Sequence, residues 1–221
     1  MKLAMARKTT AEPRRRLLER YVYKRRMRFP EFMSEWLRMQ ELEIPAHHIR
    51  MAEWLEEVWR SEDRRGLLLA FRGSGKSTVA GLFLAWLLYV DPNLRILVVA
   101  ADTALAKKMV RSVKRIIETH PDLECIRPLR KEEWRSGSFI VERSAALRDP
   151  SVMAVGLDCN VTGSRADVIV CDDVEVPKNS DSRQKRLELR EKLLELSFVL
   201  VPDGMQVYIG TPHTWDTIYK T

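Results

Sequence analysis

The chain has 221 residues, of which 45% are hydrophobic and 31% are charged, and its formal net charge is +7. This length fits one large domain, or one domain with an appendage, and supports a sizeable apolar core. No stretch reaches the roughly 18 apolar residues of a membrane span, so we expect no membrane association. The three cysteines lie far apart without metal-ligand spacing and are expected to be reduced thiols.

The positive charge is concentrated at the N-terminus. Residues 1–28 contain eleven Lys or Arg against two Glu, which gives +9 and leaves −2 for the rest of the chain. Such an arm suits a polyanion such as nucleic acid, although a solvated helix or tail has the same composition. We expect a helical N-terminal lead-in over residues 1–44, with helices at 13–28 and 31–42, before a domain over 45–221.

A third helix, expected at 46–60, precedes the most informative stretch, residues 67–78 with the sequence LLLAFRGSGKST. An apolar strand, a short loop and an apolar helix follow one another here, which is the context of a phosphate-binding P-loop. Glycines leave backbone N–H groups free to cradle phosphate oxygens, and the helix N-terminus adds its dipole. The residues expected to bind the nucleotide phosphates are Arg72, Gly73, Ser74, Gly75, Lys76, Ser77 and Thr78.

Two side chains of this loop have separate roles. Lys76 can reach the β- and γ-phosphates of ATP, and the Ser77 hydroxyl can bind Mg²⁺. The first position of the usual pattern holds Ala70 instead of glycine, and alanine tolerates positive φ poorly, so ordinary strand geometry is expected there. His48, upstream of the first strand, is a candidate for contacting the nucleotide base, and the alternative is a histidine that only caps or packs.

The rest of the chain alternates strands with helices. Nearly continuous apolar runs, such as 94–101, are typical of strands buried on both faces of a parallel sheet. The further elements expected are strands at 139–141, 151–157, 167–173 and 204–210, and helices at 104–119 and 181–198. This alternation predicts an α/β fold with a mostly parallel central sheet flanked by helices.

A second part of the nucleotide site is expected where a buried strand ends in acids. Ligands collect at the carboxyl ends of parallel strands, so Asp172 is a candidate to hold Mg²⁺ together with Ser77. Asp173 and Glu175 are both candidates to orient the attacking water, and a pair of acids capping a turn is the alternative. Thr211, after the last strand, can sense the γ-phosphate.

Phosphoryl transfer commonly uses an arginine to stabilise the charge of the transition state, either from the same chain or from a neighbour. Arg148 and Arg165 are the main candidates here, beside Arg72 and Arg143. The sequence does not decide between them. An arginine that acts on a neighbouring subunit would make the working unit a ring.

Three stretches, AFRGSGKST, TGSRADVIVCDDVEVPKNS and VYIGTPHTWDTIYK, together resemble the large terminase subunit of tailed bacteriophages, above all short-tailed phages. The resemblance covers residues 45–221 and implies a P-loop NTPase fold of the additional-strand, RecA-like type. It implies an ATPase motor that uses ATP and Mg²⁺ to translocate double-stranded DNA into the procapsid. The implied roles are Lys76 and Ser77 in the phosphate loop, Asp172 with Asp173 or Glu175 in the acidic motif, and Thr211 in the coupling motif.

The same resemblance implies partners and a location. The partners would be double-stranded DNA, the portal protein and the small terminase subunit, at the procapsid portal in the host cytoplasm. A homo-oligomeric ring, a pentamer, would be the working form, and the isolated domain could be a monomer. In this family a nuclease domain follows the coupling motif, so we expect the ATPase domain alone here, without nuclease activity. The alternatives are a helicase-like ATPase and a nucleic-acid-binding P-loop switch.

Overall fold

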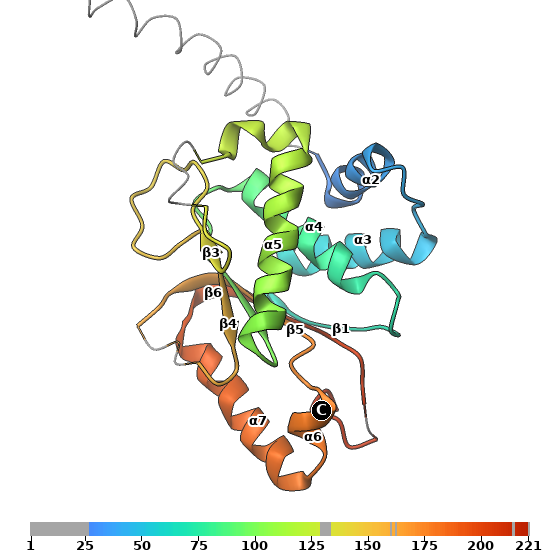
Figure 1. Cartoon of the computed structure of the whole chain (residues 1–221), viewed down its shortest axis with the longest axis vertical. Coiled ribbons are helices and arrows are strands. Elements are labelled where there is room, and N and C mark those ends of the chain that lie inside the picture. Colours follow the sequence, from blue (N-terminus) through green and yellow to red (C-terminus); the bar gives the residue numbers. More distant parts are fainter. Residues whose placement is uncertain (1–26, 129–133, 160, 162, 214, 221) are drawn as a thin grey trace, which may run out of the picture.

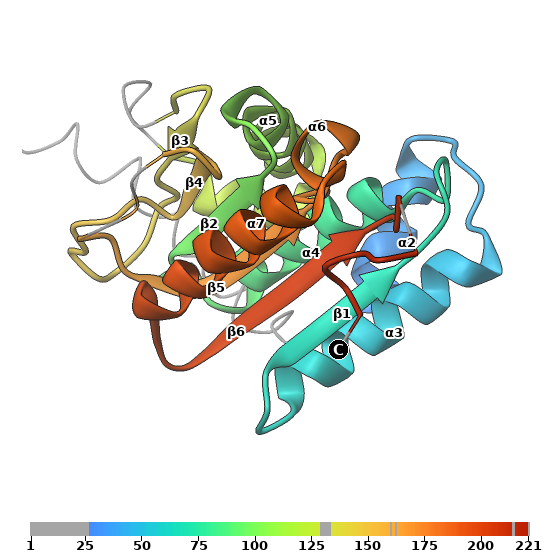
Figure 2. The same ribbon diagram turned by 90° about the horizontal axis from the view of Figure 1, so that it is seen from below.

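The computed structural model describes residues 27–128, 134–159, 161, 163–213 and 215–220. The helix expected at 13–28 and most of the basic arm lie outside these residues. A six-stranded sheet in the order β1-β6-β5-β2-β4-β3 forms the centre, and helices cover both of its faces (Figure 1; Figure 2). Among the described helices, none is long and apolar enough to cross a bilayer.

The sheet is mostly parallel, as the apolar runs predict. Only the pairing of the short strand β3 with β4 is antiparallel, and every other neighbouring pair is parallel. The strands are β1 (Arg65–Leu69), β2 (Ile96–Ala100), β3 (Ser138–Phe139), β4 (Val152–Gly156), β5 (Ala166–Asp172) and β6 (Leu200–Gly210). The carboxyl ends of β1, β2, β4, β5 and β6 therefore meet at one edge of the sheet.

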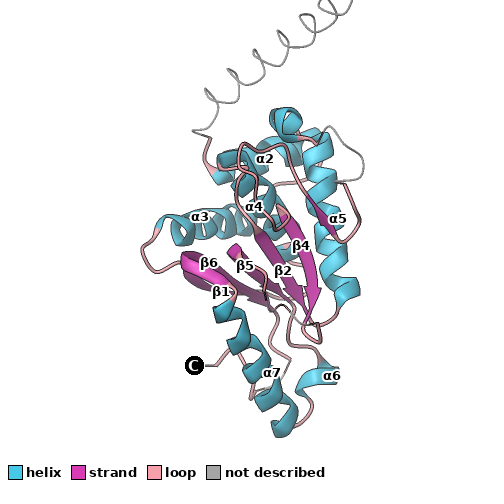
Figure 3. Cartoon of the chain, turned by 90° about the vertical axis from the view of Figure 1, so that its left-hand side faces the viewer, coloured by secondary structure: helices cyan, strands magenta, loops and turns pink. Residues whose placement is uncertain are grey.

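Helices α3, α4 and α5 lie on one face of the sheet, and α2 packs against α3 and α4 on the same side (Figure 3). Helix α7 covers the other face, and the short helix α6 packs against α7. Their bounds are α2 (Phe29–Met39), α3 (Ala46–Arg60), α4 (Lys76–Val90), α5 (Thr103–Thr119), α6 (Pro177–Ser180) and α7 (Arg183–Glu195). Short 3₁₀ turns follow α5 at Pro121–Ile126 and α7 at Leu196–Phe198. Helix α4 is apolar on nearly all sides, as expected of a helix that the sheet and the neighbouring helices bury along almost its whole length.

The strand alternation divides the core into two layers. On β2, Val98 packs in the layer of α2 to α5, while Leu97 and Val99 pack in the layer of α7. Residues of α7 such as Leu189 and Leu193 close that second layer. Successive side chains of a strand point to opposite faces, so an uninterrupted apolar run is what a strand buried on both faces requires.

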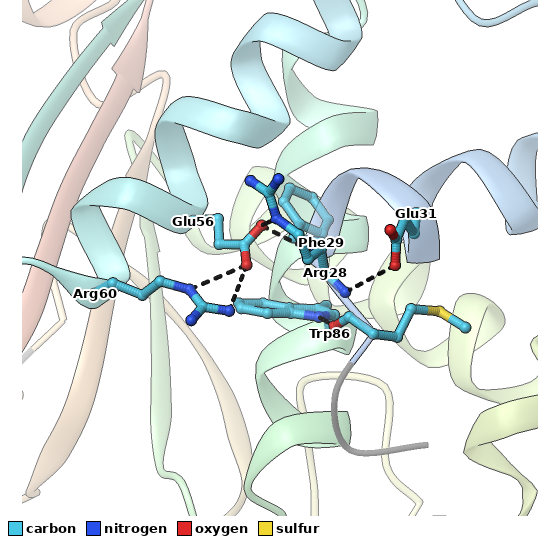
Figure 4. A network of polar contacts seen from close by, with 7 residues as sticks. Arg28, Phe29, Glu31, Glu56, Arg60 and Trp86 are labelled. Carbon is cyan, nitrogen blue, oxygen red and sulfur yellow. Dashed lines mark hydrogen bonds and ion pairs between the residues drawn. The ribbon is translucent and has the colours of Figure 1, made fainter. Parts of the chain in front are cut away.

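A buried glutamate fastens α2 to α3. Glu56 is 1% exposed, and its carboxylate accepts the Phe29 backbone N–H at 3.2 Å. The other carboxylate oxygen accepts two bonds from Arg60, at 2.6 and 3.0 Å (Figure 4). The Arg28 Nε lies 3.3 Å from the oxygen that accepts the Phe29 N–H. Arginines on both sides of this carboxylate offset the cost of burying it.

Several element bounds differ from the sequence prediction. Helix α2 begins at Phe29, before Pro30, because a proline in the first turn lacks only an N–H that the helix does not need. Strand β6 begins at Leu200 and is longer than the predicted 204–210, and the strand expected at 139–141 is reduced to Ser138–Phe139. None of these differences moves the carboxyl edge where the predicted site lies.

Candidate functional site

The loop between β1 and α4 has the backbone of an anion-binding nest. Gly73 and Gly75 have φ values of +81° and +78°, in the left-handed region that glycine tolerates best. Ala70 does not have a positive φ, so alanine is tolerated at this position without left-handed strain. Its N–H donates to the Gly210 carbonyl at 3.1 Å, which ties the loop to β6. Backbone N–H groups in such a turn form a concavity for phosphate oxygens.

A cavity of about 600 Å³ opens in front of the N-terminus of α4. It is bounded by the loop, by α5 and by the segments that follow β5 and β6. The predicted residues among its lining are Arg72, Gly73, Lys76, Ser77, Thr78, Asp172, Asp173 and Thr211. Segments up to about 140 residues apart in sequence therefore meet here because the parallel strands end at one edge.

Helix α5 contributes four cavity residues that were not predicted from the sequence. They are Leu105, Lys108, Met109 and Ser112, and Val176 and His213 also line the cavity without having been predicted. Helix α5 begins directly after β2, at the same edge of the sheet as the loop, and this position in the sequence could have indicated that α5 borders the cavity. Which of its faces turns to the cavity depends on packing against α4, which periodicity alone does not reveal.

Two polar contacts organise the charged floor of the cavity. The Lys76 ammonium lies 3.3 Å from a carboxylate oxygen of Asp173, and the Ser77 hydroxyl donates to Asp172 at 3.4 Å. Lys76 is only 8% exposed, so the fold holds its charge at the cavity. Asp173 adopts φ +45°, a sparsely populated conformation for a non-glycine residue that is common at functional sites.

Burial and the negative charge of Asp173 together raise the pKa of Asp172 to about 6, although Lys76 and the Ser77 hydroxyl act against the shift. A carboxylate beside a hydroxyl is a hard-oxygen pair of the kind that Mg²⁺ uses when nucleotide phosphates supply its other ligands. The described residues contain no group of three or more His, Cys, Asp or Glu that could hold a metal alone. The donors present thus fit a cation shared with phosphates better than a permanently bound metal.

The raised pKa makes ionised Asp172 destabilising in the nucleotide-free chain. Its pKa is about 6 in the fold against 3.8 for an unperturbed aspartate, so the free-energy penalty is small near pH 4 and complete above pH 6. Asp172→Asn should therefore stabilise the chain by up to about 3 kcal/mol at pH 8, and by much less near pH 4. Urea unfolding of both proteins in EDTA across this range measures the difference. A gain independent of pH would contradict the assignment.

Thr211 joins the end of β6 to the beginning of the loop. Its hydroxyl donates to the Ala70 carbonyl at 2.9 Å, and the side chain also lines the cavity. Thr211 therefore lies between the phosphate loop and the chain that continues from β6. This position fits the predicted role as a sensor, because a rotation of the side chain would turn its hydroxyl from the Ala70 carbonyl toward a phosphate in the cavity.

His48 lies outside the cavity lining. Its Nε2 is 2.8 Å from the Ser74 carbonyl oxygen, and the Nε2 of His47 is 2.9 Å from the same oxygen. His48 therefore contacts the loop backbone, and its contact with a nucleotide base stays a prediction. The start of α3 packs directly against the loop, so that the ring meets the main chain of Gly75.

Glu175 also lies outside the cavity lining and is fully buried. Its carboxylate accepts the Thr217 hydroxyl at 2.9 and 2.8 Å and the Ile218 N–H at 2.7 Å, and the His213 N–H lies at 3.4 Å. These donors occupy both oxygens. Of the two candidates for orienting water, the structure brings only Asp173 to the cavity.

Arg148 and Arg165 lie at the opposite edge of the sheet. Each precedes a parallel strand, β4 or β5, whereas the cavity lies where these strands end. Seven residues of β5 at about 3.3 Å each put the two edges roughly 20 Å apart. Arg143 is held by the Leu147 and Asp149 carbonyls, and Arg72 is the candidate arginine that lines the cavity. Neither Arg148 nor Arg165 reaches the cavity of its own chain.

The sheet order gives the class of protein. Strand β6 lies between the P-loop strand β1 and the acidic strand β5, which is the inserted strand of the additional-strand, RecA-like P-loop fold. The fold and the cavity thus define a P-loop nucleotide-binding protein of that class, as predicted.

Comparison with known proteins narrows the class. The chain is 37% identical over 161 residues, 72% of its length, to "Terminase, large subunit" of Enterobacteria phage T3, and this match spans 28% of that protein. The chain therefore belongs to the terminase large subunit family. It spans less than a third of the length of its T3 relative.

A solved large terminase supports the fold. The large terminase of bacteriophage HK97 superposes with a TM-score of 0.52 at 13% identity, over 76% of this chain and 33% of that chain. The large terminase ATPase domain of Thermus phage P74-26 gives 0.47 at 18% identity, over 81% and 69%. Residues 67–151 also match the family described as RNA cytidine acetyltransferase NAT10/TcmA, helicase domain.

Proposed function

We propose that this chain is the ATPase motor region of a terminase large subunit, which couples ATP hydrolysis to the translocation of double-stranded DNA into the procapsid. The observation that carries the proposal is the meeting of the Lys76 ammonium and the Ser77 hydroxyl with Asp172 and Asp173 in one cavity. Cation, hydroxyl and paired carboxylates at the carboxyl ends of parallel strands are the parts that phosphoryl transfer needs. Membership of the terminase family supports the translocation part.

Each residue of the cavity has a proposed role. The loop N–H groups and Lys76 bind the β- and γ-phosphates, and Ser77 and Asp172 are the protein ligands for Mg²⁺. Mg²⁺ would neutralise negative charge on the phosphate oxygens. Asp173 orients the attacking water after the incoming γ-phosphate draws Lys76 away from it. Arg72 is the arginine of the same chain that is near enough to contact the phosphates.

Thr211 is proposed to couple hydrolysis to movement. Its hydroxyl bonds the Ala70 carbonyl at the start of the phosphate loop, and the chain after it runs to Thr217 and Ile218. Glu175, two residues beyond Asp173, holds those two residues. A change at the γ-phosphate can therefore reach the segment 211–218 along two paths, through Thr211 and through the chain that follows β5.

The partners and the domain division are proposals as well. Residues 1–44 would form a basic lead-in that contacts DNA, and 45–221 the ATPase domain, which works as a homo-oligomeric ring with the portal protein and the small terminase subunit in the host cytoplasm. Arg148 and Arg165 are both exposed at the far edge. An arginine there could serve only the site of a neighbouring subunit.

Steady-state ATP hydrolysis, measured with and without double-stranded DNA across a protein concentration series, tests the proposal. A motor should show magnesium-dependent turnover that DNA stimulates, and turnover should rise faster than linearly with protein if a neighbour supplies the arginine. Slow turnover that ignores DNA would support a P-loop switch instead. A chain that neither binds nor hydrolyses ATP would overturn the proposed site.

A further inference from the structure

We propose that His47 and His48 are positioning residues, which orient the Ser74–Gly75 peptide so that the Gly75 N–H faces the phosphate side of the loop. The inference rests on the nucleotide site proposed above and assigns the histidines a role toward phosphate instead of base. It follows from three features of the contact between the start of α3 and the loop.

The first feature is a carbonyl with two imidazole donors. The Nε2 atoms of His47 and His48 lie 2.9 and 2.8 Å from the Ser74 carbonyl oxygen. A carbonyl oxygen has two lone pairs and only accepts, so both rings must carry a proton on Nε2 and donate it. The rings meet edge to face, with centroids 4.6 Å apart, which lets both reach one oxygen. Two donors fix the direction of this carbonyl more tightly than one donor could.

The second feature is the geometry of the peptide bond. A trans peptide is planar, so the Ser74 C=O and the Gly75 N–H point in opposite directions. Fixing the carbonyl on the histidine side therefore turns the N–H away from α3. Gly73 and Lys76, on either side of this peptide, line the cavity, whereas the histidines do not. The N–H is thus held toward the side where phosphate oxygens are proposed to bind.

The third feature is the close seating of His48 on Gly75. A Cβ atom at Gly75 would lie 2.2 Å from Nε2 and 2.7 Å from Cε1 of His48, so only glycine fits. The Nδ1 atom of His48 is buried without a hydrogen-bond partner among the described residues. The donation from Nε2 is therefore the polar contact by which this ring is held, which is the arrangement expected of a backbone support.

The proposal predicts which part of the nucleotide loses affinity when a donor is removed. His48→Leu takes away one of the two bonds, and binding of ATP and of inorganic tripolyphosphate should weaken together, by about 10-fold, which corresponds to 1.4 kcal/mol. The preference for ATP over GTP should stay unchanged. A residue that contacts the base would show the reverse pattern, with altered base preference and unchanged tripolyphosphate binding.

Conservative replacement provides the second arm. The Nε2 of glutamine can take the place of the imidazole Nε2, so His48→Gln should recover most of the lost tripolyphosphate affinity, while the double variant His47→Leu/His48→Leu should lose more than either single variant. Glu53→Gln, an exposed change on the same helix, is the matched control. Thermal unfolding without nucleotide separates lost binding from lost folding, and the glutamine variant remains informative if the leucine variant does not fold.

Titration of each variant with ATP, GTP and tripolyphosphate, followed by competition with a fluorescent ATP analogue, measures these affinities. Parallel loss for ATP and tripolyphosphate with recovery in His48→Gln would support positioning. Unchanged tripolyphosphate affinity in His48→Leu would overturn it, and so would equal loss in the leucine and glutamine variants. If the wild-type chain binds neither ATP nor tripolyphosphate, the nucleotide site itself is wrong, which is a separate outcome.

Discussion

Replacing Lys76 with alanine is expected to abolish ATP hydrolysis, lowering turnover by about 100-fold or more, the scale of losing one preorganised charge contact in the transition state. Lys76 is 8% exposed, and its ammonium lies 3.3 Å from a carboxylate oxygen of Asp173 at the cavity. A phosphate that arrives there finds a cation already desolvated and held by the fold. Without the Lys76 ammonium, the phosphates of ATP would meet the carboxylates of Asp172 and Asp173 with no cation between them.

The measurement is steady-state phosphate release at saturating ATP, compared with Lys107→Ala as a control. Lys107 lies on the same side of the sheet but is exposed and does not line the cavity, so its removal should leave turnover close to that of the wild type. Both variants should retain the fold, because neither side chain contributes to the apolar layers. Wild-type turnover in Lys76→Ala would mean that the loop is not the catalytic phosphate site.

The sequence predicts the strands and helices around this site well because each has a local cause. The apolar run of β2 is buried on both faces, the glycines of the loop adopt positive φ, and Asp102 caps α5 by accepting the Leu105 N–H. The mostly parallel sheet follows from the alternation of strands and helices. The placement of β6 between β1 and β5 has no local cause in the sequence. It was predicted only because the chain resembles a family with this fold.

The site divides in the same way. Ser77 and Asp172 are predicted to meet because both follow parallel strands, and the structure places the hydroxyl 3.4 Å from the carboxylate. Glu175 also follows β5, but its carboxylate accepts a hydrogen bond from the Thr217 hydroxyl and does not line the cavity. This contact depends on the path of the chain after β6, which the sequence does not predict. Arg165 directly precedes β5, so it lies at the amino end of the acidic strand, while the cavity lies at the carboxyl end. Its role toward a neighbouring subunit stays a prediction.

The second large effect concerns the acid that orients water. Asp173→Asn is expected to lower turnover by about 100-fold, the lower end of general acid–base contributions, while ATP affinity stays the same or rises. Affinity does not fall because Lys76 loses a competing partner 3.3 Å away and becomes free for phosphate. Asparagine also tolerates the +45° φ of this position, so the backbone should be unchanged.

Glu175→Gln should act differently, on stability more than on chemistry. The buried carboxylate accepts bonds from Thr217 and the Ile218 N–H, and a neutral amide replaces a charge-assisted acceptor, at a cost of about 1–2 kcal/mol in the free energy of unfolding. We therefore expect a lower thermal midpoint, with turnover reduced far less than in Asp173→Asn. Turnover and ATP affinity for both variants, with unfolding in urea, measure the contrast.

The opposite ranking would carry its own structural consequence. If Glu175→Gln were the more damaging change at unaltered ATP affinity, Glu175 would be the water-orienting acid, and it would have to leave Thr217 and Ile218 before each turnover. The segment after β6 would then move as a condition of hydrolysis instead of as its result. Thr217→Val removes the hydroxyl that bonds to Glu175 and so distinguishes the two acids. Turnover should rise in this variant if Glu175 must leave Thr217 to orient water, and should not rise if Asp173 orients the water.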